Sequence, residues 1–161
     1  FPTRRSSDLI EYLKMGGFID ITTGIKNEGD DAVSSSQLYQ SILKENISPY
    51  HITMSSDAGG SMPFFDKNGK LTKLTRGMPS TDMDSIRESI ESGVPMELAL
   101  IPLTASPARF LKFPGKGKIA EGCDADLILL DDKLNINTVV SRGKIMVQNY
   151  KPTVYGTFEN K

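Results

Sequence analysis

The early part of the chain alternates strand-like and helix-like segments, and this order constrains the fold more than any other feature. Apolar residues dominate residues 18–23, which read as a buried strand after the glycine pair 16–17 ends a short helix. The serines at 34–36 can cap a helix, and its apolar face would carry Leu38, Ile42 and Leu43. A second strand follows at residues 51–54. Because strand–helix–strand units require parallel strands and a right-handed crossover, we predict an α/β sheet or barrel.

Asp57 stands where the second strand runs into a glycine-rich loop, residues 58–61. Barrel enzymes keep their catalytic residues at the carboxyl ends of their strands. A carboxylate is also a hard oxygen ligand that suits zinc, and it can accept a proton from metal-activated water. Asp57 is therefore a candidate for a catalytic residue and for a metal ligand. The alternative is that Asp57 only caps the next turn.

The middle of the chain is expected to form a hairpin and then helices. Asn68 and Gly69 are a strong turn signal between two short arms. Ser80 or Thr81 would cap a helix that Gly93 ends, and Pro95 would open another helix that runs to about Leu103. The final third changes character, with short strands expected around Ile119, residues 127–130, Ile136, residues 139–140 and residues 145–147.

Composition excludes several classes of protein. The 19 basic and 20 acidic residues nearly balance, which gives no general attraction for nucleic acid or for an anionic membrane. No apolar run approaches the roughly 20 residues that span a bilayer. A single cysteine, Cys123, excludes an internal disulfide framework and fits a reducing compartment. We expect a cytoplasmic protein that binds neither nucleic acid nor membrane.

Residues 1–9 show no clean periodicity and join abruptly to the helix-like segment that follows. They resemble the translation of a sequencing-adapter oligonucleotide, so we expect them to lie outside the fold. A naturally disordered terminus is the alternative.

Three segments carry a resemblance to a known family. Residues 104–109, 117–131 and 139–144 are similar to the carboxy-terminal signature of the amidohydrolase superfamily. Within that superfamily, residues 53–57, 60–63 and 154–159 look most like the isoaspartyl (β-aspartyl) dipeptidases of peptidase family M38. The resemblance runs from residue 10 to residue 161.

The resemblance implies a (β/α)8 metal-dependent hydrolase barrel with two divalent metals, usually zinc, bridged by a carbamylated lysine and a hydroxide. Residues 10–105 would supply the last two strand–helix units of this α/β barrel, and residues 106–161 the later half of a small β-sandwich domain. Asp57 matches the family aspartate that contacts a metal and shuttles the proton. Ser61 matches the serine that binds the α-carboxylate of the substrate. Where the family commonly has Gly-Asn-Gly, this chain has Ala-Gly-Gly at 58–60.

Other metal-ligand types are weaker candidates. His51, the single histidine, begins its strand about 20 Å from Asp57 at ~3.3 Å per residue, so we expect it at the opposite end of the barrel. Cys123 has no histidine or cysteine near it in the sequence. Asp124 and Asp126 are expected to cap local amides.

The predicted function is hydrolysis of the β-aspartyl amide bond of isoaspartyl dipeptides by a full-length zinc enzyme that forms a homo-oligomer. The chain alone is expected to be inactive, because it lacks the histidine ligands and most of the barrel strands of the family. Two alternatives stay open: another amidohydrolase, similar to dihydropyrimidinases or deacylases, and a non-catalytic β-rich binding or structural module.

Overall fold

The computed structural model describes residues 6–24, 33–66 and 68–157, and the chain forms two compact units, Phe1–Phe110 and Leu111–Lys161. The sequence places the boundary slightly earlier, after Ala105. Helix α5 (Ala105–Phe110) belongs to the first unit because Ser106 is fully buried and its hydroxyl donates to the carbonyl of Tyr50 at 3.2 Å. Within the described residues, no helix has the length and apolarity needed to cross a membrane.

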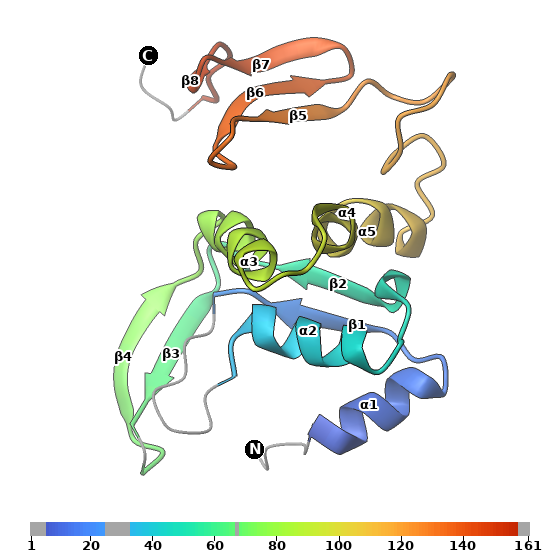
Figure 1. Cartoon of the computed structure of the whole chain (residues 1–161). Helices are drawn as coiled ribbons and strands as arrows, with labels where there is room; N and C mark the ends of the chain where they lie inside the picture. The colour runs from blue at the N-terminus through green and yellow to red at the C-terminus, as the bar shows by residue number, and fades with distance from the viewer. Residues whose placement is uncertain (1–5, 25–32, 67, 158–161) are drawn as a thin grey trace. The chain divides into compact units, whose positions relative to one another are not determined.

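The first unit is built on a parallel strand pair, β1 (Ile19–Thr22) and β2 (Ile52–Ser55), joined through helix α2 (Ser35–Lys44) (Figure 1). This confirms the strand–helix–strand prediction. Register pairs Ile21 with Met54, and both side chains are buried. They pack in one core with apolar residues of β2, of four helices and of two connecting segments: Leu13, Tyr39, Ile42, Ile47, Ile52, Ile86, Val94 and Ala99.

Only one face of β1 is buried, so the expectation of a fully buried strand is wrong. Asp20 is exposed, and the Phe18 side chain before the strand keeps 42% of its surface exposed. Alternation of side chains along a strand explains the difference, because Ile21 points to the core and Asp20 to the other face.

Helix α2 has the start that its sequence predicts. The Ser34 hydroxyl accepts from the amide of Gln37 at 3.2 Å, and the Gln37 side chain accepts from the Ser34 amide at 2.9 Å, which forms a capping box. Deeper in the helix, the buried Tyr39 donates its hydroxyl to the carbonyl of Leu98 at 2.6 Å. Burial raises the pKa of Tyr39 well above its usual range, so the hydroxyl remains a donor.

Helix α3 (Ser80–Glu91) begins without the cap that the sequence suggests. Pro79 occupies the cap position and no side chain bonds to the first amides, so a cap by Ser80 or Thr81 is wrong. The Thr81 hydroxyl lies 2.9 Å from the carbonyl of Met78 instead. Gly93 follows the helix with a φ of 94°, as expected of a helix end. Helix α4 (Met96–Leu100) starts after Pro95, and a short 3₁₀ turn, η2 (Ile101–Leu103), follows it.

Helix α1 (Ser6–Lys14) extends into the segment that we expected to lie outside the fold. Residues 1–5 lie outside the described part of the chain, but Leu9 packs partly against the core. Apolar contact of this kind requires only a suitable helix face, so the odd sequence of the segment does not prevent it.

Between β2 and α3 lies a hairpin of β3 (Ser61–Phe65) and β4 (Leu71–Arg76), paired antiparallel. Its turn contains Gly69 with a φ of 75°, which confirms the turn prediction at residues 68–69. Figure 1 shows the hairpin at the end of the unit where β1 and β2 both finish.

The second unit is a four-stranded antiparallel sheet in the order β5 (Leu127–Leu130), β6 (Ile136–Ser141), β7 (Lys144–Gln148) and β8 (Lys151–Pro152). The strand expected around Ile119 is absent from residues 111–157, and that side chain is 90% exposed. None of residues 111–157 is fully buried, although β5 and β7 carry several large apolar side chains.

Carboxylates hold the turns of this unit. Lys116 forms ion pairs with Asp124, at 2.8 Å, and with Asp126. Asp126 also accepts from the amide of Arg142 at 2.7 Å, and the Lys116 and Arg142 hydrogen bonds lower the pKa of Asp126. Hydrogen bonds from the backbone and side chain of Asn135 lower the pKa of Asp131 to about 2. Asp126 therefore accepts from a backbone amide, as expected, whereas the Asp124 carboxylate pairs with Lys116 and not with an amide.

Replacement of a central side chain by alanine tests the packing of the core of the first unit. Ile42 is fully buried, so Ile42→Ala should lower the free energy of unfolding by about 2–5 kcal/mol. Leu74→Ala, at a side chain that is 62% exposed, should cost less than about 1 kcal/mol. Urea unfolding followed by circular dichroism measures both, and equal losses would contradict the assignment of the core.

Candidate active site

Asp57 lies two residues after the end of β2, and its backbone adopts a left-handed conformation with a φ of 48°. The side chain is exposed, and within the described residues its carboxylate has no hydrogen-bond or ion-pair partner. A left-handed conformation costs a residue other than glycine of the order of 1–3 kcal/mol and persists only where its surroundings impose it. The structure therefore holds an unpaired carboxylate at the strand end, where the sequence predicts the catalytic group.

Two glycines lie in close contact with Asp57. A Cβ atom on Gly77 would lie 2.1 Å from the backbone carbonyl oxygen of Asp57, so no larger residue fits there. A Cβ atom on Gly60 would lie 2.7 Å from the Asp57 Oδ1 atom. The carboxylate of Asp57 thus lies against the bare backbone of Gly60.

Backbone hydrogen bonds close the loop around Asp57. The amide of Gly60 donates to the carbonyl of Asp57 at 2.9 Å, which makes a tight turn. Gly59 donates to the carbonyl of Gly77 at 3.1 Å, and Gly77 donates to the carbonyl of Gly60 at 2.9 Å. The end of β4 is therefore joined to the Asp57 loop. Sequence reasoning missed Gly77, although a glycine directly after a strand is a signal of close backbone approach.

Ser61 is the first residue of β3, and its side chain is exposed. In the antiparallel register it lies opposite Arg76, the last residue of β4. The structure thus brings the two residues predicted to serve the site, Asp57 and Ser61, onto one loop and the base of one hairpin. The predicted metal and substrate roles are not tested by this placement.

Thr23 connects the ends of both parallel strands to helix α3. Its amide donates to the carbonyl of Ser55 at 2.9 Å, and its hydroxyl donates to the carboxylate of Asp82 at 2.8 Å. The Thr23 and Thr81 hydroxyls also lie 2.8 Å apart. Thr23 is buried, so these bonds support the strand end that carries Asp57. Sequence reasoning missed this group, because no local pattern joins residues 23 and 82.

The polar face of the strand pair holds a second carboxylate. Asp20 accepts from the hydroxyl of Thr53 at 2.7 Å and from the hydroxyl of Ser55 at 2.6 Å. Both Asp20 oxygens are thus engaged by the neighbouring strand, unlike those of Asp57.

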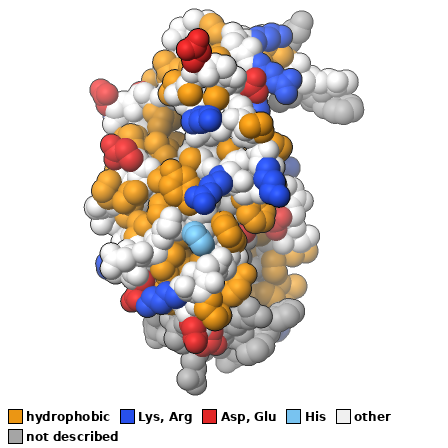
Figure 2. All heavy atoms as spheres, turned by 90° about the vertical axis from the view of Figure 1, so that its right-hand side faces the viewer, with side chains coloured by type: hydrophobic (Ala, Val, Ile, Leu, Met, Phe, Trp, Pro, Cys, Tyr) orange, Lys and Arg blue, Asp and Glu red, His pale blue; other side chains and the backbone are white. Residues whose placement is uncertain are grey.

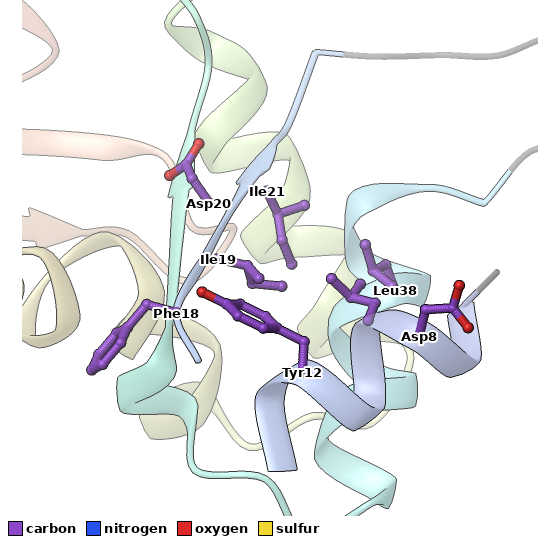
Figure 3. A pocket seen from close by; sticks show the side chains of 8 residues that line it. Asp8, Tyr12, Phe18, Ile19, Asp20, Ile21 and Leu38 are labelled. Atoms are coloured by element: carbon purple, nitrogen blue, oxygen red, sulfur yellow. The ribbon is translucent and has the colours of Figure 1, made fainter. Parts of the chain in front are cut away.

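A hollow of about 730 Å³ lies between α1 and β1, lined by Asp8, Leu9, Tyr12, Phe18, Ile19, Asp20, Ile21 and Leu38 (Figure 3). Most of its lining is apolar, and Asp8 and Asp20 lie at separate ends of it in Figure 3. In the described part of the chain, β1 pairs only with β2, so the hollow follows an unpaired strand edge. Its chemistry suits a packing element better than a polar substrate.

His51 is the last residue of a 3₁₀ turn, η1 (Pro49–His51), directly before β2, and so lies at the end of the strand opposite to Asp57, as expected. Its ring stacks on Phe18 with centroids 4.6 Å apart, and its Nδ1 atom lies 2.9 Å from the carbonyl oxygen of Gly17. Figure 2 shows the histidine among apolar side chains on the surface. These contacts indicate a packing role.

The described residues do not complete a metal site by themselves. In residues 6–24, 33–66 and 68–157, no three histidine, cysteine, aspartate or glutamate side chains converge as metal ligands would. Asp57 fits as one oxygen ligand, because it is exposed and unpaired.

Comparison with known proteins assigns the chain to a family. The model of the Amidohydrolase family matches residues 7–146, which is most of the chain. The chain therefore belongs to the amidohydrolase family, whose members generally use metal ions.

Solved structures add a narrower likeness. The chain is similar to the β-aspartyl dipeptidase of the thermophilic, keratin-degrading Fervidobacterium islandicum AW-1 in complex with a β-Asp-Leu dipeptide, with a TM-score of 0.80 and 32% identity. That match covers 95% of this chain and 39% of the dipeptidase. A second structure of the Fervidobacterium enzyme matches with a TM-score of 0.76 and 28% identity, over 95% of this chain and 37% of that one. The chain thus spans about two fifths of these relatives.

Two further matches are more limited: one is a short sequence match, and the other shows the fold alone. An adenine deaminase of Geobacillus kaustophilus (strain HTA426) is 34% identical over 67 residues, which cover 40% of this chain and 12% of the deaminase. The N-acetyl-D-glucosamine-6-phosphate deacetylase of Mycobacterium smegmatis matches with a TM-score of 0.62 at 20% identity, over 92% of this chain and 43% of that one.

The two glycines at Asp57 make a matched pair for a stability test. Gly77→Ala should destabilise the protein by more than about 3 kcal/mol, because the new methyl group meets backbone that cannot move without breaking the turn. Gly60→Ala should cost about 1 kcal/mol or less, since its methyl group meets a side chain that can rotate. Thermal unfolding measures both variants. Similar losses would show that Gly77 does not impose the loop conformation.

Removal of the Thr23 hydroxyl tests the hydrogen bonds that join the ends of the strands to helix α3. Thr23→Val should lower the free energy of unfolding by about 1–3 kcal/mol, because the Asp82 carboxylate loses a donor in a partly buried place. Thr22→Val makes the same change one residue earlier, where no side-chain hydrogen bond forms, and should be nearly neutral. Denaturant unfolding compares the two, and an equal effect would argue against the network.

Proposed function

We propose that the complete protein containing this chain hydrolyses the β-aspartyl amide bond of isoaspartyl dipeptides. The observation that carries the proposal is the unpaired Asp57 carboxylate at the end of β2, with Ser61 just after it, in a chain 32% identical to a dipeptidase solved with β-Asp-Leu. The alternative of another amidohydrolase, deacylase-like or dihydropyrimidinase-like, has less support. The deacetylase likeness at 20% identity concerns the fold alone.

Asp57 would act as the proton carrier of the reaction. Its exposed carboxylate can accept a proton from the attacking water and deliver it to the amine that leaves when the amide breaks. The tight turn at Gly60 fixes the backbone that carries the carboxylate, which reduces the entropy lost on reaching the transition state.

Ser61 would bind the α-carboxylate of the dipeptide. Its hydroxyl is a neutral donor that suits a carboxylate oxygen, and it is exposed at the base of the hairpin. The Ala-Gly-Gly loop between the two residues leaves its backbone accessible, so a substrate can approach closely.

Two zinc ions would complete the site, with Asp57 as one oxygen ligand from this chain. When bound, zinc would polarise the amide carbonyl and lower the pKa of water to about 7, so that attack proceeds at neutral pH. The other ligands would come from parts of the complete protein outside this chain. An additional strand along the free edge of β1 would extend the pair toward a barrel and fill the apolar hollow. Homo-oligomer formation and a cytoplasmic location stay predictions.

Asp57→Asn in the complete protein tests the proposal. The amide keeps the size of the side chain but cannot carry the proton, so kcat for β-aspartyl-leucine should fall by at least about 100-fold. Glu97→Gln, the same change at an exposed position of α4, should leave the rate unchanged. Release of leucine measured by an amino-acid assay gives the result. A metal-loaded wild-type protein with no activity on β-aspartyl dipeptides would overturn the substrate assignment, and an inert protein that binds no metal would favour a binding module.

A further inference from the structure

We infer that Arg76 and Ser61 together bind the isoaspartyl α-carboxylate, so that the hairpin base selects dipeptides in which this carboxyl group is free and negatively charged. This inference rests on the proposed function and adds a residue that determines specificity.

The register of the hairpin carries the argument. Ser61 and Arg76 are direct partners in the antiparallel pair of β3 and β4. Residues directly opposite each other leave the same face of a sheet, with Cβ atoms about 4.5–5.5 Å apart. A carboxylate bound to the Ser61 hydroxyl would therefore lie within reach of the Arg76 guanidinium.

The contact of Gly77 with the Asp57 loop fixes the position of the neighbouring Arg76. Gly77, its neighbour in the chain, lies so close to the Asp57 carbonyl that a Cβ atom would not fit. The two backbone hydrogen bonds that Gly77 makes with Gly59 and Gly60 hold the end of β4 there. Arg76 is thus anchored near the proposed catalytic carboxylate through its backbone, and its side chain is exposed.

The unpaired positive charge of Arg76 supports the same inference. Arg76 has no ion-pair partner among the described residues, so no carboxylate in this part of the chain neutralises it. A guanidinium can donate two parallel hydrogen bonds to one carboxylate, whereas a serine hydroxyl donates one. The pair would bind the anionic α-carboxylate and would discriminate against a neutral carboxamide of the same shape at that position.

Lys73 provides a matched control on the same strand. It lies opposite Phe64, with its Nζ atom 5.9 Å from the centre of that ring, and it is an odd number of residues from Arg76. Side chains alternate along a strand, so Lys73 leaves the opposite face of the hairpin. Lys73→Gln removes the same charge from the same element without touching the proposed site.

The test measures binding in the complete, metal-loaded protein with Asp57→Asn, so that the ligand is not consumed. Calorimetry compares β-aspartyl-leucine with an analogue whose isoaspartyl α-carboxylate is replaced by a carboxamide, so that only this negative charge is lost. Arg76→Gln should weaken binding of the free acid by about 10- to 100-fold and leave binding of the amide unchanged. Arg76→Lys should recover part of the loss, because lysine keeps the positive charge but lacks the two parallel hydrogen-bond donors of the guanidinium. Lys73→Gln should change neither affinity.

Equal losses for the acid and the amide, or equal losses in the Arg76 and Lys73 variants, would overturn the inference. Turnover by the protein that retains Asp57 shows whether the proposed function or only the role of Arg76 is wrong. If that protein hydrolyses β-aspartyl-leucine and Arg76→Gln leaves its KM unchanged, the proposed function is supported and the role of Arg76 is contradicted. If it neither hydrolyses nor binds either dipeptide, both fall together.

Discussion

The parallel register of β1 and β2 is the constraint on which the rest of the first unit depends. It aligns Ile21 with Met54 on the face that the helices bury, and it aligns Asp20 with Thr53 on the other face. A shift of one residue would exchange the two faces, which would bury Asp20 and expose the isoleucine. Because the register is determined by burial, the point where β2 ends is determined as well, and Asp57 follows at that point.

The strand end alone does not hold Asp57 in a left-handed conformation. The chain leaves the strand, makes a long excursion as a hairpin and returns through Gly77, which meets the Asp57 backbone. The return has two consequences. It provides the surroundings that stabilise an unfavourable backbone conformation, and it places Ser61 and Arg76 together at the hairpin base. The hairpin is therefore part of the proposed site, and changes to its length would be expected to move these groups.

Much of this could be predicted from local sequence. The helix at Ser34, the turn at Gly69 and the position of Asp57 after a strand each depend on neighbouring residues, and all three are confirmed. The contacts that support the site depend on residues far apart in the chain. Thr23 and Asp82 meet only because β1 ends beside the start of α3, and the closeness of Gly77 to Asp57 depends on the hairpin pairing. Single-sequence patterns report periodicity and turns, so they do not reveal such pairs.

The chain also indicates how the proposed chemistry would be divided within a larger protein. In the proposed reaction its described residues would supply a proton carrier and a carboxylate-binding pair, whereas no three of them converge as metal ligands would. Such a division is physically reasonable in a barrel, because each strand end contributes one or two side chains to a shared site. The free edge of β1 and the apolar hollow beside it are consistent with further strands in that position. Substrate selection through the hairpin and water activation through the metals would then come from different parts of one fold, and each could change without the other.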